Sequence, residues 1–342
     1  MAPLMNVTIP DDYQDCVRYL HCFEKLARHG VQVFNDSTKN LADLAARLVT
    51  ADAIVLTRER TAVSAALLDR LPRLRFISQT GSIGPHVDLD ACTARGIAVA
   101  DGRGSGVSSS TAELAWALVL ASRRHLLAEA NRLRDGLWQG HLGRQLKGRR
   151  LGIWSYGRIG RQVAAYGKAF GMEVWVWGGP GSTASARADG YAVAPSREAF
   201  FIDSDVVSLH LRLVPETRGI ITLADLSLMK PTGLLVNTSR AELLAPHALE
   251  RALRQGRPGF AAVDVYEEEP VLGARHPLLQ LPNALCTPHI GFVEQDNYES
   301  AYGAAFDNIA RYAAGEPVSL LNPEVQQHER QKSLPVYSET RT

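Results

Sequence analysis

The first hundred residues alternate between short apolar runs and longer stretches in which apolar residues recur at helical spacing. The apolar runs at residues 6–9, 31–34, 53–56, 74–78 and 97–100 predict β-strands. Helices are predicted at residues 11–29, 41–49 and 64–71, the first with Asp11 as its N-cap and Gly30 as its end. This alternation is typical of the α/β class, in which helices cover both faces of a parallel sheet.

A second series of strand-like runs follows, at residues 151–154, 174–177, 205–211, 234–237, 261–265 and 284–287. Helices are predicted at residues 159–170 and 297–314. A long helical stretch from residue 112 to about residue 127, with more helix to about residue 138, precedes the series. The glycine cluster at 101–106 predicts a crossover between two domains. The tail from residue 324 is polar, and we expect it to be poorly ordered.

The composition is that of an ordinary globular chain. The 342 residues are 46% hydrophobic, and 37 basic against 36 acidic side chains give a net charge of +1. That length suggests about two domains, and the balanced charge argues against nucleic-acid binding. No apolar run reaches the roughly 18 residues of a membrane helix, and the N-terminus has no signal-peptide pattern. The four cysteines lack metal-binding or disulfide spacing, so we expect no bound metal and a cytoplasmic location.

A glycine motif follows the strand predicted at 151–154. Residues 151–161 read LGIWSYGRIGR, where a strand passes through a tight turn into a helix, as dinucleotide binding requires. The helix N-terminus would offer N–H groups to a pyrophosphate, Gly157 would let the backbone approach it, and Gly160 would let the helix pack closely. Ser155 replaces the first glycine of such motifs, and an ordinary strand-to-helix turn stays an alternative. The candidate cofactor contacts here are Tyr156, Gly157, Arg158, Ile159 and Gly160.

No acid ends the second strand of this series, where a carboxylate usually binds the adenosine ribose. The strand at 174–177 is followed by GGPGST at 178–183. A ribose 2′-phosphate would not be repelled there, and Ser182, Thr183 and Arg187 could donate hydrogen bonds to it. The cofactor is therefore expected to be NAD or NADP, with the hypothesis that NADP is accepted. A flexible loop that does not discriminate between the two is the alternative.

Three later segments, each at the end of a predicted strand, carry the candidate catalytic residues. They read VNTSRAE at 236–242, AVDVYEEEP at 262–270 and CTPHIG at 286–291. Parallel strands end at one edge of a sheet, so an arginine, a carboxylate and a histidine could converge there. This set, in this order and spacing, resembles the D-isomer-specific 2-hydroxyacid dehydrogenases. The resemblance extends from about residue 7 to about residue 323.

The resemblance implies a role for each residue of the set. Arg240 would bind the substrate carboxylate and polarise the carbonyl, His289 would act as general acid and base, and Glu269 would orient its imidazole. Asp264 would contact the nicotinamide carboxamide. Further cofactor contacts are expected at Thr111, His210, Thr217, Asn237 and Thr238. Arg212 stands where relatives usually have proline, and it could stack on adenine or contact a 2′-phosphate.

Taken singly, several of these residues have plainer explanations. Arg240 and Arg212 could be solvated surface charges, and His289 could be a structural histidine. A run of three glutamates is usually an exposed turn, and Glu267 or Glu268 could replace Glu269 as the histidine's partner.

Residues 79–88 read QTGSIGPHVD and match a glycine-rich loop that in this family binds the substrate carboxylate through backbone N–H groups. The candidates for contact are Ser82, Ile83 and Gly84. The loop departs from the family's pattern at Ile83 and Pro85. Ile83 disfavours positive φ, and Pro85 has no N–H to donate. We therefore expect a small 2-hydroxy or 2-keto acid whose carboxylate is bound in an altered way.

The resemblance implies two doubly wound parallel-sheet domains, with a Rossmann-type cofactor domain inserted into a flavodoxin-like substrate domain. We assign residues 1–104 and 293–328 to the substrate domain, 105–292 to the NAD(P)-binding domain and 329–342 to a polar tail. The expected reaction is hydride transfer between NAD(P) and C2 of the acid. A homodimer is expected because residues 112–148 resemble the family's dimerisation arm. Two other functions stay open. One is oxidation of a phosphite-type acid with the same three residues, Arg240, Glu269 and His289, and the other is nucleotide sensing like that of the corepressors of this family.

Overall fold

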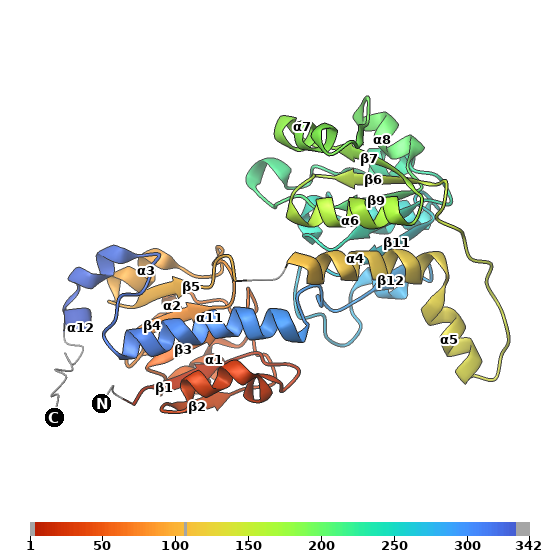
Figure 1. The fold of residues 1–342 in the computed structure, drawn as a ribbon. Helices are drawn as coiled ribbons and strands as arrows, with labels where there is room; N and C mark the ends of the chain where they lie inside the picture. The colour runs from red at the N-terminus through yellow and green to blue at the C-terminus, as the bar shows by residue number, and fades with distance from the viewer. Residues whose placement is uncertain (1–3, 106–107, 333–342) are drawn as a thin grey trace. The chain divides into compact units, whose positions relative to one another are not determined.

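The computed structural model describes residues 4–105 and 108–332. Residues 106–107, at the end of the predicted crossover, and residues 333–342 of the predicted tail lie outside the described residues. The chain divides into two compact units, Met1–Val107 with Glu294–Thr342, and Ser108–Val293. Each unit is built on one parallel sheet, of five strands in the first and seven in the second (Figure 1). The predicted fold class, two parallel-sheet α/β domains, is confirmed.

The sheet of the first unit has the strand order β2-β1-β3-β4-β5, which is the flavodoxin-like order. Apolar side chains of α1, α2 and α3 pack on one face. The long helix α11 packs on β3, β4 and β5, where Tyr302 and Phe306 are fully buried. The strands are β1 (Asn6–Ile9), β2 (Gly30–Val33), β3 (Ala53–Leu56), β4 (Phe76–Gln79) and β5 (Ala98–Asp101). The α-helices are α1 (Leu41–Leu48), α2 (Ala65–Leu68), α3 (Leu89–Ala94), α11 (Gln295–Ala313) and α12 (Glu329–Lys332).

The helix predicted at residues 11–29 is wrong. Two short 3₁₀ helices, Val17–Tyr19 and His21–Leu26, occupy part of this segment, and Asp11 has a left-handed φ of 63°. Carboxylates take the backbone N–H groups that a continuous helix would use. Asp12 accepts from the amides of Cys16 and Val17 at 3.2 and 3.0 Å. Glu299 of α11 accepts from those of His21 and Cys22 at 2.6 and 2.9 Å. Gly30 begins β2 and does not end a helix.

The predicted disorder of the tail is wrong for residues 324–332. They form a 3₁₀ helix, Pro323–Gln327, followed by α12. Val325 is buried, and the Arg330 guanidinium donates to the carbonyl oxygens of Pro72, Leu74 and Arg95. Side-chain hydrogen bonds to the sheet domain therefore fix this polar segment.

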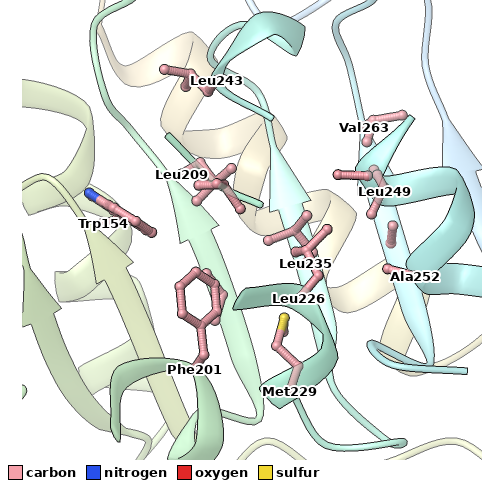
Figure 2. Close-up of a cluster of buried hydrophobic side chains, with 14 of the residues drawn as sticks. Trp154, Phe201, Leu209, Leu226, Met229, Leu235, Leu243, Leu249, Ala252 and Val263 are labelled. Carbon is pink, nitrogen blue, oxygen red and sulfur yellow. The ribbon is translucent and has the colours of Figure 1, made fainter. Parts of the chain in front are cut away.

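The sheet of the second unit has the order β12-β11-β10-β9-β6-β7-β8, which is the Rossmann order. Apolar residues of α4, α6 and α7 pack on one face. Those of α8, α9 and α10 pack on the other, in the cluster that Figure 2 shows. The strands are β6 (Arg150–Trp154), β7 (Glu173–Trp177), β8 (Ala192–Val193), β9 (Val206–Leu209), β10 (Leu234–Asn237), β11 (Phe260–Val263) and β12 (Ala284–Cys286). The α-helices are α4 (Ser108–Arg123), α5 (Leu126–Arg134), α6 (Arg158–Ala169), α7 (Pro180–Ala188), α8 (Arg197–Asp203), α9 (Leu223–Leu228) and α10 (Ala248–Arg254).

The helix predicted from residue 112 to about residue 127, with more helix to about residue 138, is divided at His125. This residue has a left-handed φ of 50°, so α4 ends before it and α5 begins after it. Helix α5 and the connection after it extend away from the sheet of their unit (Figure 1). No residue of α5 is buried.

Candidate active site

The predicted dinucleotide loop joins β6 to α6. Ser155 adopts a φ of 79°, the left-handed region that usually selects glycine, so the turn forms without the motif's first glycine. A side chain at Gly160 would collide with the Ser155 carbonyl oxygen and approach Ile153 to 3.2 Å. Glycine at 160 therefore lets α6 pack directly on the turn.

The N-terminus of α6 offers room and donors for an anion. Gly157 is its N-cap, with no side-chain cap, and no atom lies within 4 Å of the position a Cβ would take there. The amides of the first turn have no intrahelical partner. Arg158 is exposed beside them. The Tyr156 side chain is buried and its hydroxyl donates to Asp189 at 2.9 Å, so it belongs to the core. This cradle fits the pyrophosphate of a dinucleotide.

The segment after β7 is helical and not a flexible loop. Helix α7 begins at Pro180, directly after Gly178 and Gly179. The Ser182 hydroxyl accepts a hydrogen bond from the Tyr156 amide and so links α7 to the dinucleotide loop. The Thr183 hydroxyl donates to the carbonyl oxygen of Pro180 at 3.1 Å. Gly179, the N-cap of α7, provides no side-chain cap.

Glu269 and His289 form a close pair at the carboxyl edge of the sheet. The Oε2 atom of Glu269 lies 2.6 Å from Nδ1 of His289. The other carboxylate oxygen accepts from the Tyr266 amide at 3.0 Å. Glu267 contacts a different imidazole, His276, at 3.0 Å. Of the glutamates in the run, Glu269 therefore contacts the candidate acid and base.

The backbone around His289 is held in an uncommon conformation. His289 has a left-handed φ of 52°. The Asp264 carboxylate accepts from the amides of Ile290 and Gly291 at 2.9 and 2.8 Å and from the Thr287 hydroxyl at 2.6 Å. Burial raises the pKa of Asp264, whereas these three hydrogen bonds favour its carboxylate form. Both oxygens of Asp264 therefore serve the turn that presents His289.

Thr111 and Tyr266 also donate hydrogen bonds to the turn that carries His289, and the sequence analysis did not predict the role of Tyr266. The Thr111 hydroxyl, from α4, donates to the Gly291 carbonyl at 2.9 Å. Tyr266 is the missed residue: its hydroxyl donates to the Thr287 carbonyl at 2.9 Å while its amide donates to Glu269. Burial raises the pKa of Tyr266, so it stays a neutral donor. The only sequence signal was a tyrosine next to the glutamate run.

Arg240 follows β10, the neighbour of β11, so its turn lies at the same edge as Asp264. The Asn237 side chain shapes this turn, because its Nδ2 donates to the Arg240 carbonyl at 2.9 Å and its Oδ1 accepts from the Ser239 amide at 3.0 Å. The Arg240 guanidinium donates to the Ser239 carbonyl at 2.7 Å. The hydroxyl of Thr238 is buried without a hydrogen-bond partner in the described structure. An orphaned donor of this kind fits a bound cofactor.

The remaining expected cofactor residues lie around the end of β9. The Nε2 atom of His210 lies 3.0 Å from the Ser208 hydroxyl, and burial lowers the pKa of His210 to about 4, so the imidazole is neutral. The Thr217 hydroxyl donates to the Arg212 carbonyl at 2.7 Å and so stabilises the following turn. The Arg212 side chain is exposed.

The predicted substrate loop lies in the first unit, after β4. The Ile83 amide donates to the Asp101 carboxylate at 3.2 Å, so this N–H is already taken. The Gln79 side chain donates to the Ser82 carbonyl at 2.7 Å. Ser82 is exposed and Gly84 is partly exposed. The loop is thus braced by its own unit through Ile83.

Two features, a membrane-spanning helix and a metal-binding cluster, are not found in the described parts of the chain. No helix there is long and apolar enough to cross a membrane. No cluster of three or more histidine, cysteine, aspartate or glutamate side chains there could hold a metal ion.

Comparison with known proteins identifies a family whose members this chain resembles. A family model described as D-isomer specific 2-hydroxyacid dehydrogenase, NAD binding domain, matches residues 116–291. The glyoxylate reductase of Aeropyrum pernix is 36% identical over 269 residues, covering 76% of this chain and 79% of the reductase. A crystal structure from Ralstonia solanacearum, provisionally described as a D-3-phosphoglycerate dehydrogenase oxidoreductase, has a TM-score of 0.91 at 49% identity, covering 94% of this chain and 98% of its own. A phosphoglycerate oxidoreductase from Vibrio cholerae has a TM-score of 0.88 at 47% identity, covering 91% and 100%.

Proposed function

This chain belongs to the D-isomer-specific 2-hydroxyacid dehydrogenases, and we propose that it transfers a hydride between NAD(P) and C2 of a small 2-hydroxy or 2-keto acid. The observation that carries the proposal is the 2.6 Å contact between Glu269 and His289, at the sheet edge that also carries the Arg240 turn. A nicotinamide cofactor, when bound, supplies the hydride or accepts it. The N-terminus of α6, Arg158 and the Thr238 hydroxyl are the groups that would hold it.

Each member of the triad has one task in the proposed reaction. The His289 imidazole gives a proton to the ketone oxygen during reduction and takes it from the hydroxyl during oxidation. Glu269 orients the imidazole through Nδ1 and stabilises its positive charge. Arg240 binds the substrate carboxylate and polarises the neighbouring carbonyl, tasks that suit a planar, permanently charged guanidinium.

Substrate binding and assembly are further parts of the proposal. Ser82, Ile83 and Gly84 would contact the substrate carboxylate. Because the Ile83 amide already donates to Asp101, fewer free N–H groups remain for this task. The exposed apolar side chains after α4, which include Leu142 at 94% and Trp138 at 74% exposure, support a homodimer formed through residues 112–148. We keep the cytoplasm as the expected location.

NADP use is the finer part of the cofactor proposal. Gly178 and Gly179 leave no carboxylate at the end of β7, and the uncapped first turn of α7 would favour a 2′-phosphate. Gly179→Asp tests this, since its Cβ would meet no atom within 4 Å. We expect the variant to lose NADPH affinity about tenfold relative to NADH through charge repulsion. Gly179→Asn, of equal shape without charge, is the control. A wild-type preference for NADH would contradict NADP use.

The proposed reaction is tested by cofactor titration followed by a substrate panel. NADH and NADPH are titrated calorimetrically, and the tighter complex is then assayed with 2-keto acids that include glyoxylate and hydroxypyruvate. Phosphite is assayed separately with NAD⁺ and NADP⁺, which can accept its hydride, to detect oxidation of a non-carbon acid. Consumption of the reduced cofactor with at least one 2-keto acid supports the proposal. A complete lack of turnover across the panel, with the cofactor bound, would favour a sensing role instead.

A further inference from the structure

A second basic site lies at the amino edge of the seven-stranded sheet, opposite the candidate active site. A shallow, solvent-open hollow is lined there by Arg123, Arg144, Arg149, Asp205 and Thr232, among others. A second shallow hollow shares Arg123 and Arg144. These residues come from the end of α4, the connection before β6 and the segments that enter β9 and β10. All of them belong to the second unit.

Arg123 is the buried floor of the site. It is 5% exposed, and its guanidinium donates to the carbonyl oxygens of Thr232, at 2.6 Å, and Asp205. Both acceptors are neutral, and no carboxylate in the described structure contacts this guanidinium. Burial lowers the pKa of Arg123 to about 10, which reflects the cost of keeping the charge away from water. An anion beside it would reduce that cost.

The lining carries more positive than negative charge. Asp205 is its only carboxylate, against three arginines. Asp205 is already engaged, because its Oδ1 accepts from Lys230 Nζ at 3.1 Å and its Oδ2 accepts from the Arg150 amide at 2.9 Å. Arg149 reaches Asp205 at only 3.8 Å.

Two further groups of the lining have unused donors. Arg144 is exposed, and its guanidinium has no hydrogen bond or ion pair within residues 4–105 and 108–332, although its amide donates to the Arg123 carbonyl at 2.8 Å. In the second hollow, the Ser122 hydroxyl is buried with no partner among the same residues.

We propose that this site binds a phosphate dianion, either free or as the ester group of a small metabolite. Three guanidinium groups against one engaged carboxylate leave an excess of about two positive charges, which a dianion would balance. The planar donor pairs of arginine match the oxygens of phosphate. The bound anion would link the end of α4, through Arg123, to the connection that carries Arg144 and Arg149. It would thereby fasten the segment that returns from α5 to the sheet.

The test is calorimetric titration with sodium phosphate at constant ionic strength. The protein is first saturated with its nicotinamide dinucleotide, so that the N-terminus of α6 does not take up phosphate. We expect one phosphate per chain, with affinity weakened about tenfold or more in Arg144→Gln and in Arg149→Gln, since each loses a charge-assisted hydrogen bond. The control is Arg134→Gln, which removes an exposed arginine of α5 that contacts Asn131 and should leave the affinity unchanged.

Glycerol 3-phosphate, titrated in parallel, distinguishes the two sources of the anion. Tighter binding of the ester identifies a metabolite phosphate, and tighter binding of inorganic phosphate identifies the free ion; both support the site if they depend on Arg144 and Arg149. No saturable binding, or equal weakening in Arg134→Gln, means an adventitious ion only and overturns the proposal. If Arg144→Gln and Arg149→Gln bind phosphate as tightly as the wild type but dissociate into monomers, these arginines serve contact between copies, and the proposal is also overturned.

Discussion

The second unit contains two histidine–carboxylate pairs of equal length in very different places. Glu269 and His289 are 2.6 Å apart, and so are Glu129 and His141. In both pairs the carboxylate also accepts from a backbone amide, that of Tyr266 or Gly140. His141 stacks on His125, which contacts Phe260 at the start of β11. The second pair therefore lies toward the amino edge of the sheet, and the first lies at the carboxyl edge.

The difference teaches that a short hydrogen bond does not by itself make an active site. Parallel strands direct the turns that carry Arg240, Asp264 and His289 to one edge, where open α/β sheets bind ligands. Around His289 the turn is fixed by Asp264 and Thr111. The His141 side chain, by contrast, is 43% exposed on the expected dimerisation arm, residues 112–148. The position in the sheet and the fixed backbone are what distinguish the first pair.

The largest effect expected from this contrast is the loss of turnover in His289→Asn. Asparagine tolerates the left-handed φ of 52°, so the turn is kept while the proposed proton donor is lost. We expect kcat to fall about 10³-fold with cofactor binding retained, as measured by steady-state assays and titration. His125→Asn, at a left-handed φ of 50°, is the matched control and should change kcat less than about twofold. If the His289 variant keeps a tenth of the activity, another residue transfers the proton.

The next effect separates the two carboxylates. Glu269→Gln keeps a hydrogen-bond acceptor for His289 but removes the charge that stabilises the imidazolium. We expect kcat to fall about 100-fold, against less than about twofold in Glu129→Gln. Both variants are compared by kcat and KM on the same substrate. Equal losses in the two variants would show that the arm, and not the sheet edge alone, supports catalysis.

A smaller effect is expected from Asp264→Asn, which tests the fixed backbone. The carboxylate accepts three hydrogen bonds, and an amide would turn its own NH₂ group toward one of those donors. We expect the free energy of unfolding to fall by about 2 kcal/mol, as measured by chemical denaturation. Turnover should fall with it, because the His289 turn loosens. An unchanged unfolding free energy would mean that Asp264 does not hold the turn.

Much of the architecture could be predicted from local sequence. The strands β1 and β3 have the predicted bounds, because each is a short apolar run between polar turns. The helix prediction at 11–29 failed in part because the amides of His21 and Cys22 are taken by Glu299, a residue far away in the chain. No local pattern could reveal that competition.

The candidate site divides in the same way. The convergence of Glu269 and His289 was predictable, since β11 and β12 are parallel neighbours and both residues follow their strand ends. The turn that supports them was not. It depends on a left-handed φ at His289 and on Tyr266 and Thr287, whose contacts arise only once the two strands are paired.

The smallest effect concerns the pH dependence of stability on the arm side. Burial and the neighbouring His141 lower the pKa of His125 from its usual 6.5, with Arg123 and Arg144 adding to this and Glu129 opposing it. The unfolded chain therefore binds a proton at His125 more readily than the folded chain. Stability contributed by the neutral imidazole is present above about pH 6.5 and is lost as the pH falls below it.

His125→Asn should remove this dependence at the cost of the ring contacts with His141 and Phe260, about 1 kcal/mol. Unfolding free energies are measured at pH 7.5 and 5.5, and we expect the wild type to lose more stability between them than the variant. The other histidines with a lowered pKa, His29, His86 and His210, are present in both proteins, so their contribution cancels in the difference. Identical losses would mean that His125 titrates normally.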